Sequence, residues 1–236
     1  MPASAGGAVA VRSTVQMGDG GRKREAMSDE LVFYTHPMSR GRTVRWMLEE
    51  VGRPYRTELR EFGTTMKSPE YLAINPMGKV PALRHGAVVV TETAAICAYL
   101  ADAFPESGLA PSPGDPRRGP YYRWLFFGAG PLEAAWTNQA LGFATPPERA
   151  RMAGYGSLDS VLQTLEGALS QREYLASDSF TAADLFVGAQ LGFGLRFGMI
   201  ERRPVLVAYA ERLAARPAAM RARETDDALS AARPTA

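Results

Sequence analysis

Two stretches of the sequence carry residues whose types and spacing suit a peptide-like ligand. The first is the run NPMGKVP at residues 75–81, in which Val80 precedes Pro81. A residue before proline is pushed into an extended conformation, and the bond between them is of the kind for which the cis form is accessible. A cis bond would turn the amide and carbonyl of Val80 outward. These groups could then pair with the main chain of a bound peptide, as an added strand does.

The second stretch offers a place for a charged head group. Glu92 and Thr93 begin an apolar segment that extends to Tyr99 and is predicted to be helical. Free amides and the positive end of a helix dipole favour a carboxylate. Thr93 adds a hydroxyl donor, and Glu92 can accept from an amine. A ligand with an extended middle and an amino-acid head group would therefore fit both stretches.

Ser39 is the candidate for chemistry on a thiol, because it lies between a predicted strand at 31–35 and the start of a predicted helix. Amides and the dipole at a helix N-terminus lower the pKa of a thiol, and the thiolate is the nucleophile. Lowering a thiol pKa from about 8.5 towards about 6.5 takes about 1.36 kcal/mol per unit. One or two hydrogen bonds to charge, worth roughly 1.5–3 kcal/mol each, are enough.

Three alternatives to a catalytic Ser39 remain open at this level. Serine often serves as a helix N-cap. Thr35, at the end of the strand, is a rival hydroxyl, and a backbone amide is a third possible donor. Tyr34 lies within the strand and is expected in the core.

The elements around these residues predict a thioredoxin-like domain over residues 31–103. The apolar strand at 31–35 is followed by a helix with Val44, Met47 and Leu48 on one face, which Gly52 ends. An alternating run at 55–59 predicts a second strand. A short helix near 66–74, two strands around 84–86 and the helix after 92 complete a βαβ unit followed by αββα.

The motif Asn-Pro-x-Gly-x-Val-Pro-Ala-Leu, followed by a strand pair and Glu-Thr-x-Ala-Ile, resembles the glutathione-binding half of the glutathione transferases. The resemblance extends over roughly residues 31–217. It implies that Pro81 is cis, that Val80 pairs with the cysteinyl backbone of glutathione, and that Glu92 and Thr93 hold the γ-glutamyl head. Each motif alone could be an ordinary turn or helix start, but the two in this order and spacing are specific.

The same resemblance assigns further glutathione contacts. It leaves open which residue of the loop before the first helix matches the family's serine. Lys67 and Lys79 match positions that meet the glycyl carboxylate, although either lysine could be plain surface. The loop resembles the serine-type classes, some of which would place their serine at Met38. The reactive cysteine of the cysteine-type bacterial class would fall near Arg40, so a disulfide-forming mechanism is not expected. For Arg40, Arg42 and Arg45, the default interpretation is a solvated helix face.

A second, all-helical domain is predicted after a linker. Residues 104–119 are rich in proline and glycine, which is typical of linkers, and the strand signal ends there. The resemblance places an apolar electrophile between the domains, where Tyr121, Trp124 and Phe127, with Trp136, could line its pocket; core or dimer contacts are the alternative. Further along, Pro131 should kink its helix, and a helix should begin at residues 146–148. Thr181 and Asp184 form a capping box, which is structural.

Composition narrows the possible partners. The net charge of +2 argues against nucleic acid and acidic membranes, and no apolar run approaches the roughly 18–20 residues that span a bilayer. Cys97 is the only cysteine, so no intrachain disulfide can form, and it is expected to be buried. The two histidines and the single cysteine are not spaced as metal ligands. Because there is so little cysteine, a cytoplasmic location is expected.

The sequence thus predicts a glutathione transferase that presents the glutathione thiolate to a small hydrophobic electrophile. The expected organisation is a disordered leader at 1–30, a thioredoxin-like domain at 31–103, a linker at 104–119, a helical domain at 120–217 and a tail at 218–236 without a motif. Met27 is a possible natural start. Homodimerisation follows from the resemblance only. The alternatives are a non-catalytic glutathione-binding scaffold and a glutathione-dependent isomerase or dehalogenase.

Overall fold

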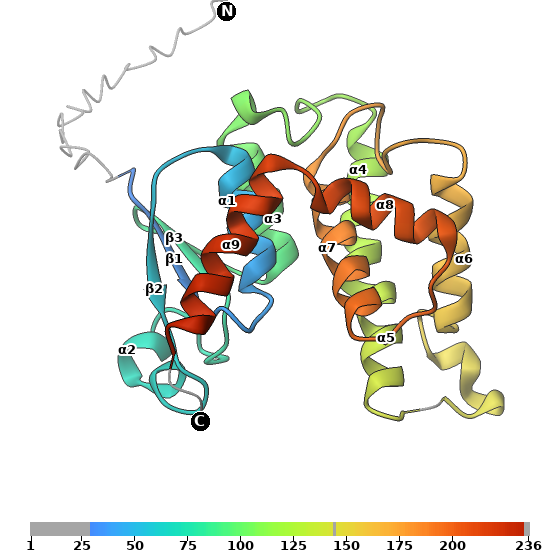
Figure 1. The fold of residues 1–236 in the computed structure, drawn as a ribbon, viewed down its shortest axis with the longest axis horizontal. Coiled ribbons are helices and arrows are strands. Elements are labelled where there is room, and N and C mark those ends of the chain that lie inside the picture. The colour runs from blue at the N-terminus through green and yellow to red at the C-terminus, as the bar shows by residue number, and fades with distance from the viewer. Residues whose placement is uncertain (1–28, 144, 234–236) are drawn as a thin grey trace, which may run out of the picture.

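The computed structural model describes residues 29–143 and 145–233, which form a thioredoxin-like domain and a helical domain (Figure 1). In the first domain a 3-10 turn at Thr65–Lys67 precedes the short helix α2. The predicted βαβ unit followed by αββα is confirmed. Its elements are β1 (Leu31–Thr35), α1 (Gly41–Val51), β2 (Tyr55–Leu59), α2 (Pro69–Leu72), β3 (Ala82–His85), β4 (Val88–Thr91) and α3 (Thr93–Ala103).

The four strands form one mixed sheet in the order β2-β1-β3-β4. β1 pairs in parallel with β2 and antiparallel with β3, and β3 pairs antiparallel with β4. The predicted apolar face of α1 is buried, with Val44, Met47 and Leu48 fully enclosed. The helix ends at Gly52, whose φ of 72° is the left-handed conformation that glycine accepts without strain.

The helical domain has two local differences from the sequence prediction. The break expected at Pro131 is a π-helical turn at Gly128–Leu132, because proline cannot supply an amide to the regular ladder. The helix expected from residue 146 is a 3-10 segment at Pro147–Met152 instead, and a regular helix starts only where Ser157 caps it. The α-helices of this domain are α4 (Arg118–Phe127), α5 (Glu133–Ala140), α6 (Leu158–Leu169), α7 (Ala182–Arg196), α8 (Pro204–Ala214) and α9 (Pro217–Ala231).

The predicted capping box at the start of α7 is confirmed. The Asp184 carboxylate is fully buried and accepts from the amides of Leu175 and Thr181, at 2.7 and 2.9 Å, and from the hydroxyls of Thr181 and Tyr209, both at 2.8 Å. This fixes α7, which lies at the centre of the molecule. Burial nevertheless raises the pKa of Asp184, because removing its charge from water outweighs these bonds.

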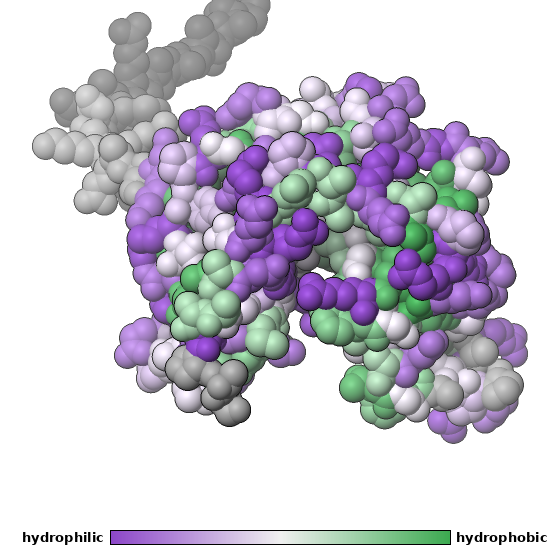
Figure 2. Space-filling view, viewed as in Figure 1, coloured by the Kyte–Doolittle hydropathy of each residue, from purple (hydrophilic) through white to green (hydrophobic). Residues whose placement is uncertain are grey.

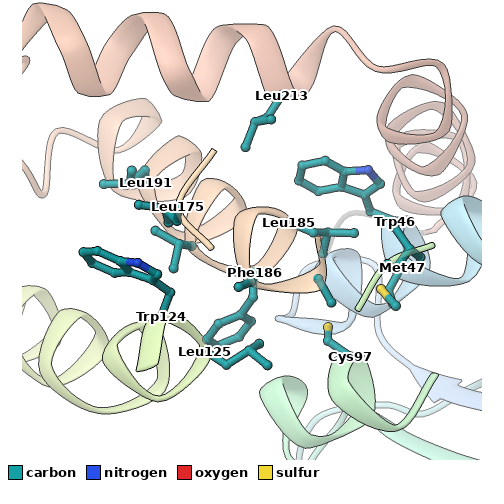
Figure 3. Close-up of a cluster of buried hydrophobic side chains, with 14 of the residues drawn as sticks. Trp46, Met47, Cys97, Trp124, Leu125, Leu175, Leu185, Phe186, Leu191 and Leu213 are labelled. Atoms are coloured by element: carbon teal, nitrogen blue, oxygen red, sulfur yellow. The ribbon is translucent and has the colours of Figure 1, made fainter. Parts of the chain in front are cut away.

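One hydrophobic core extends across both domains. Figure 3 shows Trp46 and Met47 of α1 and Cys97 of α3 facing Leu185 and Phe186 of α7. The burial predicted for Cys97 is confirmed, and burial raises the pKa of its thiol to about 12. The packing of α1 and α3 on α7 fixes how the two domains sit against each other.

Most of the described part of the tail, in which no motif was found, belongs to the helix α9 (Pro217–Ala231), which lies along α1 (Figure 1). Its Asp226 forms an ion pair of 2.8 Å with Arg45, and both side chains are almost completely buried. The interpretation of Arg45 as part of a solvated helix face is therefore wrong. The acidic partner lies 181 residues away, where a local pattern cannot reveal it.

Neither a membrane-crossing helix nor a metal-ligand cluster appears in the described part of the chain. No helix there is long and apolar enough to span a bilayer. No group of three or more His, Cys, Asp or Glu side chains gathers among the same residues.

Candidate functional site

The register of the sheet brings the two predicted binding stretches and Ser39 to one edge. Tyr34, next to the end of β1, pairs with Ala82 at the start of β3, and Ala82 pairs with Thr91 at the end of β4. Neighbouring strands lie about 4.8 Å apart. The loop after β1, the Val80–Pro81 bond before β3 and the start of α3 are therefore adjacent. The Val80–Pro81 bond is cis, as predicted.

Hydrogen bonds within the 75–81 loop hold Val80 in place. The carbonyl of Lys79 accepts from the Tyr71 hydroxyl at 2.6 Å and from the Asn75 side-chain amide at 2.8 Å. Gly78 has φ 57°, and a Cβ there would lie 2.7 Å from the carbonyl oxygen of Met66. The amide and carbonyl of Val80 hydrogen-bond to no described residue. A rigid loop thus leaves one half-buried peptide edge available for pairing.

Glu92 has a conformation that indicates a functional constraint. It is the one described residue other than glycine with a positive φ, 66°, and it caps α3 through its carbonyl, which accepts from the Ile96 amide at 2.9 Å. Such a conformation costs on the order of 1–3 kcal/mol. The Glu92 side chain is exposed and makes no capping bond, and Thr93 begins the helix half-buried beside it. The Glu92 carboxylate is thus left exposed beside the start of α3.

Ser39 lies in the tight turn just before α1, with its hydroxyl already engaged. The oxygen accepts from the Gly41 amide at 3.0 Å, and the hydroxyl donates to the His36 carbonyl at 2.7 Å. Ser39 thus binds an amide of the first helical residue, as a cap does, although the residue in the N-cap position is Arg40. The amide of Arg40 donates to no group within the described chain. This turn therefore contains an unpaired amide beside a half-buried hydroxyl.

The two other hydroxyls considered near Ser39 are enclosed. Thr35 is fully buried, and a Cβ on Gly41 would lie only 1.9 Å from its hydroxyl oxygen, so α1 packs directly over Thr35. Tyr34 is buried in the sheet, as expected. Thr35 accordingly has no surface that a ligand could reach.

His36 holds the turn, a role that sequence reasoning missed. Its Nδ1 accepts from the Met38 amide at 3.1 Å, and its ring is 5% exposed. Burial, and secondarily the positive charge of Arg233, lower the pKa of His36. The neutral ring is the form that can accept this bond. The sequence His-Pro-Met-Ser before a helix was the available signal for this role of His36. The contribution of Arg233 could not be found in this way, because Arg233 lies far along the chain.

The two lysines differ in their surroundings. The Lys67 ammonium donates to the Met77 carbonyl at 3.1 Å, so it lies against the 75–81 loop. The side chain of Lys79 is exposed. Lys67 thus approaches the predicted ligand edge while keeping two donors available, and Lys79 is an exposed positive charge near it.

Two of the α4 aromatic residues that were expected to line the electrophile pocket, Tyr121 and Trp124, are buried in the core. Tyr121 is 0% and Trp124 2% exposed, because α4 packs against α7. This burial lends no support to a role for these two residues in lining the substrate pocket, and that role stays a prediction. Phe127 is half-buried and packs edge-on against Trp124, with ring centroids 5.4 Å apart.

Three neighbouring aromatic rings lie on α5 and at the C-terminal end of α7. The ring of Phe193 lies 5.7 Å from Trp136 and 4.7 Å from Phe197, and Phe193 and Phe197 are about half exposed. Arg40 reaches these rings from the other domain. Its guanidinium forms a 2.7 Å ion pair with Glu133 and lies 5.6 Å from the Trp136 ring. Figure 2 shows a hollow between the two lobes.

Comparisons with known proteins agree with this geometry. Family models described as the N-terminal and C-terminal domains of glutathione S-transferase match residues 38–103 and 126–217. Glutathione S-transferase 3 of Zea mays is 31% identical over 163 residues, which cover 64% of this chain and 73% of the relative. The chain belongs to the glutathione S-transferase family. GstA of Escherichia coli O157:H7 is also 31% identical, over 69% of this transferase and 78% of the relative.

A solved transferase structure matches over both domains. The sphingomonad glutathione S-transferase, described as complexed with glutathione, superposes with a TM-score of 0.69 at 28% identity. It covers 83% of this chain and 98% of its own. The two-domain transferase fold is therefore confirmed, and the chain is a glutathione S-transferase whose electrophile remains to be assigned.

Proposed function

We propose that this transferase binds glutathione at the sheet edge and presents its thiolate to a hydrophobic electrophile. The observation that carries the proposal is the arrangement of unpaired groups at that edge. The turn at Ser39 follows the end of β1, the main chain of Val80 precedes the start of β3, and the carboxylate of Glu92 follows the end of β4, and these three strand ends are neighbours in the sheet. Glutathione is a tripeptide with an amino-acid head group for Glu92, a main chain that can pair with Val80 and a central thiol for the turn at Ser39.

In the proposed complex, each end of glutathione meets a different element. The cysteinyl main chain pairs with Val80 in the manner of an added strand. The γ-glutamyl amine binds Glu92, and its carboxylate binds Thr93 at the start of α3. The glycyl carboxylate lies towards Lys67 and Lys79. The half-exposed Val80 and the exposed side chain of Glu92 support this placement.

Thiolate stabilisation falls to the turn before α1. The Ser39 hydroxyl turns from the His36 carbonyl to the sulfur, while the Gly41 amide keeps its oxygen in place. The amide of Arg40 is a second donor in the same turn. The thiol proton leaves to solvent, and the thiolate sulfur then forms a bond to the electrophilic carbon while the bond from that carbon to its leaving group breaks, so that the leaving group departs to solvent with the electron pair. Holding both reactants together in a suitable orientation adds further rate.

Phe193 and Phe197, which pack beside the buried Trp136, are the proposed contact surface for the electrophile. Exposed aromatic surface beside a turn that stabilises charge suits a flat apolar reactant. Phe127 remains a candidate at the edge of this surface, because it is only half-buried.

The decisive measurement is the pKa of the bound glutathione thiol, followed through thiolate absorbance against pH. In the parent protein we expect it to lie one to two units below the usual value of about 8.5. Ser39→Ala should raise it by about one unit and lower kcat about tenfold, since one unit is about 1.36 kcal/mol. Ser170→Ala is the matched control, because its hydroxyl also donates to a main-chain carbonyl, that of Gly167.

Two outcomes would contradict the proposal at different points. If S-methylglutathione, which has no free thiol, fails to bind the parent protein, the glutathione site is wrong. If it binds and Ser39→Ala leaves the thiol pKa unchanged, activation belongs to another donor, of which the Arg40 amide is the first to consider.

A non-catalytic binding role is the second candidate, and one observation favours it. The Ser39 hydroxyl already has a short 2.7 Å bond to the His36 carbonyl, which must break before it can serve a thiolate. A bound thiol with the same pKa as in free glutathione would support this alternative.

The homodimer implied by the family resemblance stays a proposal. Its support is the exposed apolar surface of Phe126, 72% exposed, and Tyr122, 39% exposed, on α4. The molecular mass in solution, from light scattering, tests it.

A further inference from the structure

The turn that carries Ser39 is held from outside by two chains of contacts, both of which lead to α9. The first chain runs through Arg42 on α1. Its guanidinium donates to the Pro37 carbonyl at 3.4 Å and forms an ion pair with Asp227. The Arg42 side chain is 30% exposed, so part of this contact is shielded from solvent. Asp227 thereby keeps a donor directed at the main chain of the turn.

The second chain runs through His36. Its Nδ1 accepts from the Met38 amide, and its Nε2 lies 3.7 Å from a carboxylate oxygen of Glu61. Arg233, just beyond the end of α9, forms an ion pair with that same oxygen. Arg233 therefore helps to fix Glu61, which in turn lies against the ring that holds the turn.

The position of α9 is itself set by a rigid contact. Asp226 and Arg45 pair within the core, and Arg45 also donates to the hydroxyls of Tyr55 and Thr57 at 3.2 Å. Because Asp227 follows Asp226 directly, its placement over Arg42 depends on this buried anchor. Figure 1 shows α9 lying along α1.

We propose that Asp227 and Arg233 are positioning residues for thiolate stabilisation, acting through Arg42 and through Glu61 with His36 to hold the turn at Ser39. The proposal rests on the function proposed above. It assigns a role in the active site of the N-terminal domain to the last described helix. Neither residue touches glutathione; each acts through another side chain.

The charge state of His36 supplies a pH-dependent signature. The groups that face it are the Met38 amide, the Glu61 carboxylate, the Phe62 ring and the charge of Arg233. Burial and Arg233 lower the pKa of His36, which favours the neutral ring, and the bond from the Met38 amide requires the tautomer with an unprotonated Nδ1. Removing Arg233 raises that pKa. The bond to Met38 should then be lost at a higher pH as the solution is acidified.

The first experiment needs no ligand. Amide hydrogen exchange of residues 36–43 is compared in the full chain for the parent, Asp227→Asn and Arg233→Met. Each change should speed exchange about two- to fivefold, as expected from partly exposed ion pairs of up to about 1 kcal/mol. Arg221→Met is the matched control, because Arg221 pairs with Glu49 at the other end of α1.

The second experiment measures the pKa of bound glutathione thiol and the pH profile of kcat. Asp227→Asn and Arg233→Met should raise the thiol pKa and lower kcat, while the Kd for S-methylglutathione stays within about twofold of the parent value. Arg233→Met should also move the acidic limb of the profile to higher pH. Arg233→Lys and Asp227→Glu keep the charges and should restore parent behaviour.

The outcomes separate this inference from the proposed function. Exchange rates equal to those of Arg221→Met would overturn the positioning role, whatever the kinetics. If the variants exchange faster but the parent protein itself does not lower the pKa of the bound glutathione thiol, the proposed thiolate activation is overturned instead. A kcat loss that the charge-preserving variants do not rescue would also count against the positioning role.

Discussion

At the scale of single residues, the strained backbone of Glu92 is the sharpest test of the glutathione head site. Its φ of 66° is a conformation that glycine adopts without strain and alanine does not. Glu92→Ala and Glu92→Gly both remove the carboxylate, so both should weaken glutathione binding at least about tenfold, by about 1.4 kcal/mol. Only Glu92→Gly relieves the strain.

The two variants should therefore differ in stability in an unusual direction. We expect Glu92→Gly to unfold at a higher urea concentration than Glu92→Ala. The difference in the free energy of unfolding should be about 1 kcal/mol. In an ordinary helix the order is reversed, with alanine more stable than glycine by roughly 0.5–1 kcal/mol. Equal midpoints would mean that the backbone at residue 92 carries no strain.

At the scale of elements, the pairing of α9 with α1 through Arg45 and Asp226 should be costly to break from one side. Arg45→Met leaves the Asp226 carboxylate buried without a partner and should lower the free energy of unfolding by roughly 3–5 kcal/mol. The double variant Arg45→Met with Asp226→Leu should recover most of that loss, because two apolar side chains then fill the site. Chemical denaturation measures both, and a double variant no more stable than the single one would refute this account.

How far the elements could be predicted depends on the range of each signal. The strand at Leu31–Thr35, the end of α1 at Gly52 and the capping box at Asp184 are local patterns, and the structure has them as expected. The cis form of the Val80–Pro81 bond was expected from the family resemblance of the NPMGKVP run, since the local sequence indicates only that this form is accessible. The burial of Trp124 was not predictable, because it depends on how α4 packs against α7. The contact of Arg40 with Glu133 joins residues 93 positions apart and leaves no local pattern.

At the scale of the whole molecule, the shared core predicts that both domains unfold together. Trp46 on α1 packs within the cluster that includes Leu185 and Phe186 of the helical domain. A variant that keeps Trp46 alone, with Trp124→Phe and Trp136→Phe, reports on the first domain by fluorescence and on all helices by circular dichroism. The two midpoints in urea should coincide within error. Separate midpoints would show that each domain is stable without the other.

The buried pair between α1 and α9 also has a consequence for biosynthesis. Arg45 leaves the ribosome 181 residues before Asp226. At about 5–20 residues per second, roughly 10–40 s pass before the partner carboxylate exists. During that interval a nascent chain must keep the guanidinium hydrated, so α1 cannot complete its packing while translation continues. The thioredoxin-like half is synthesised first, but its packing is complete only after α9 has been made.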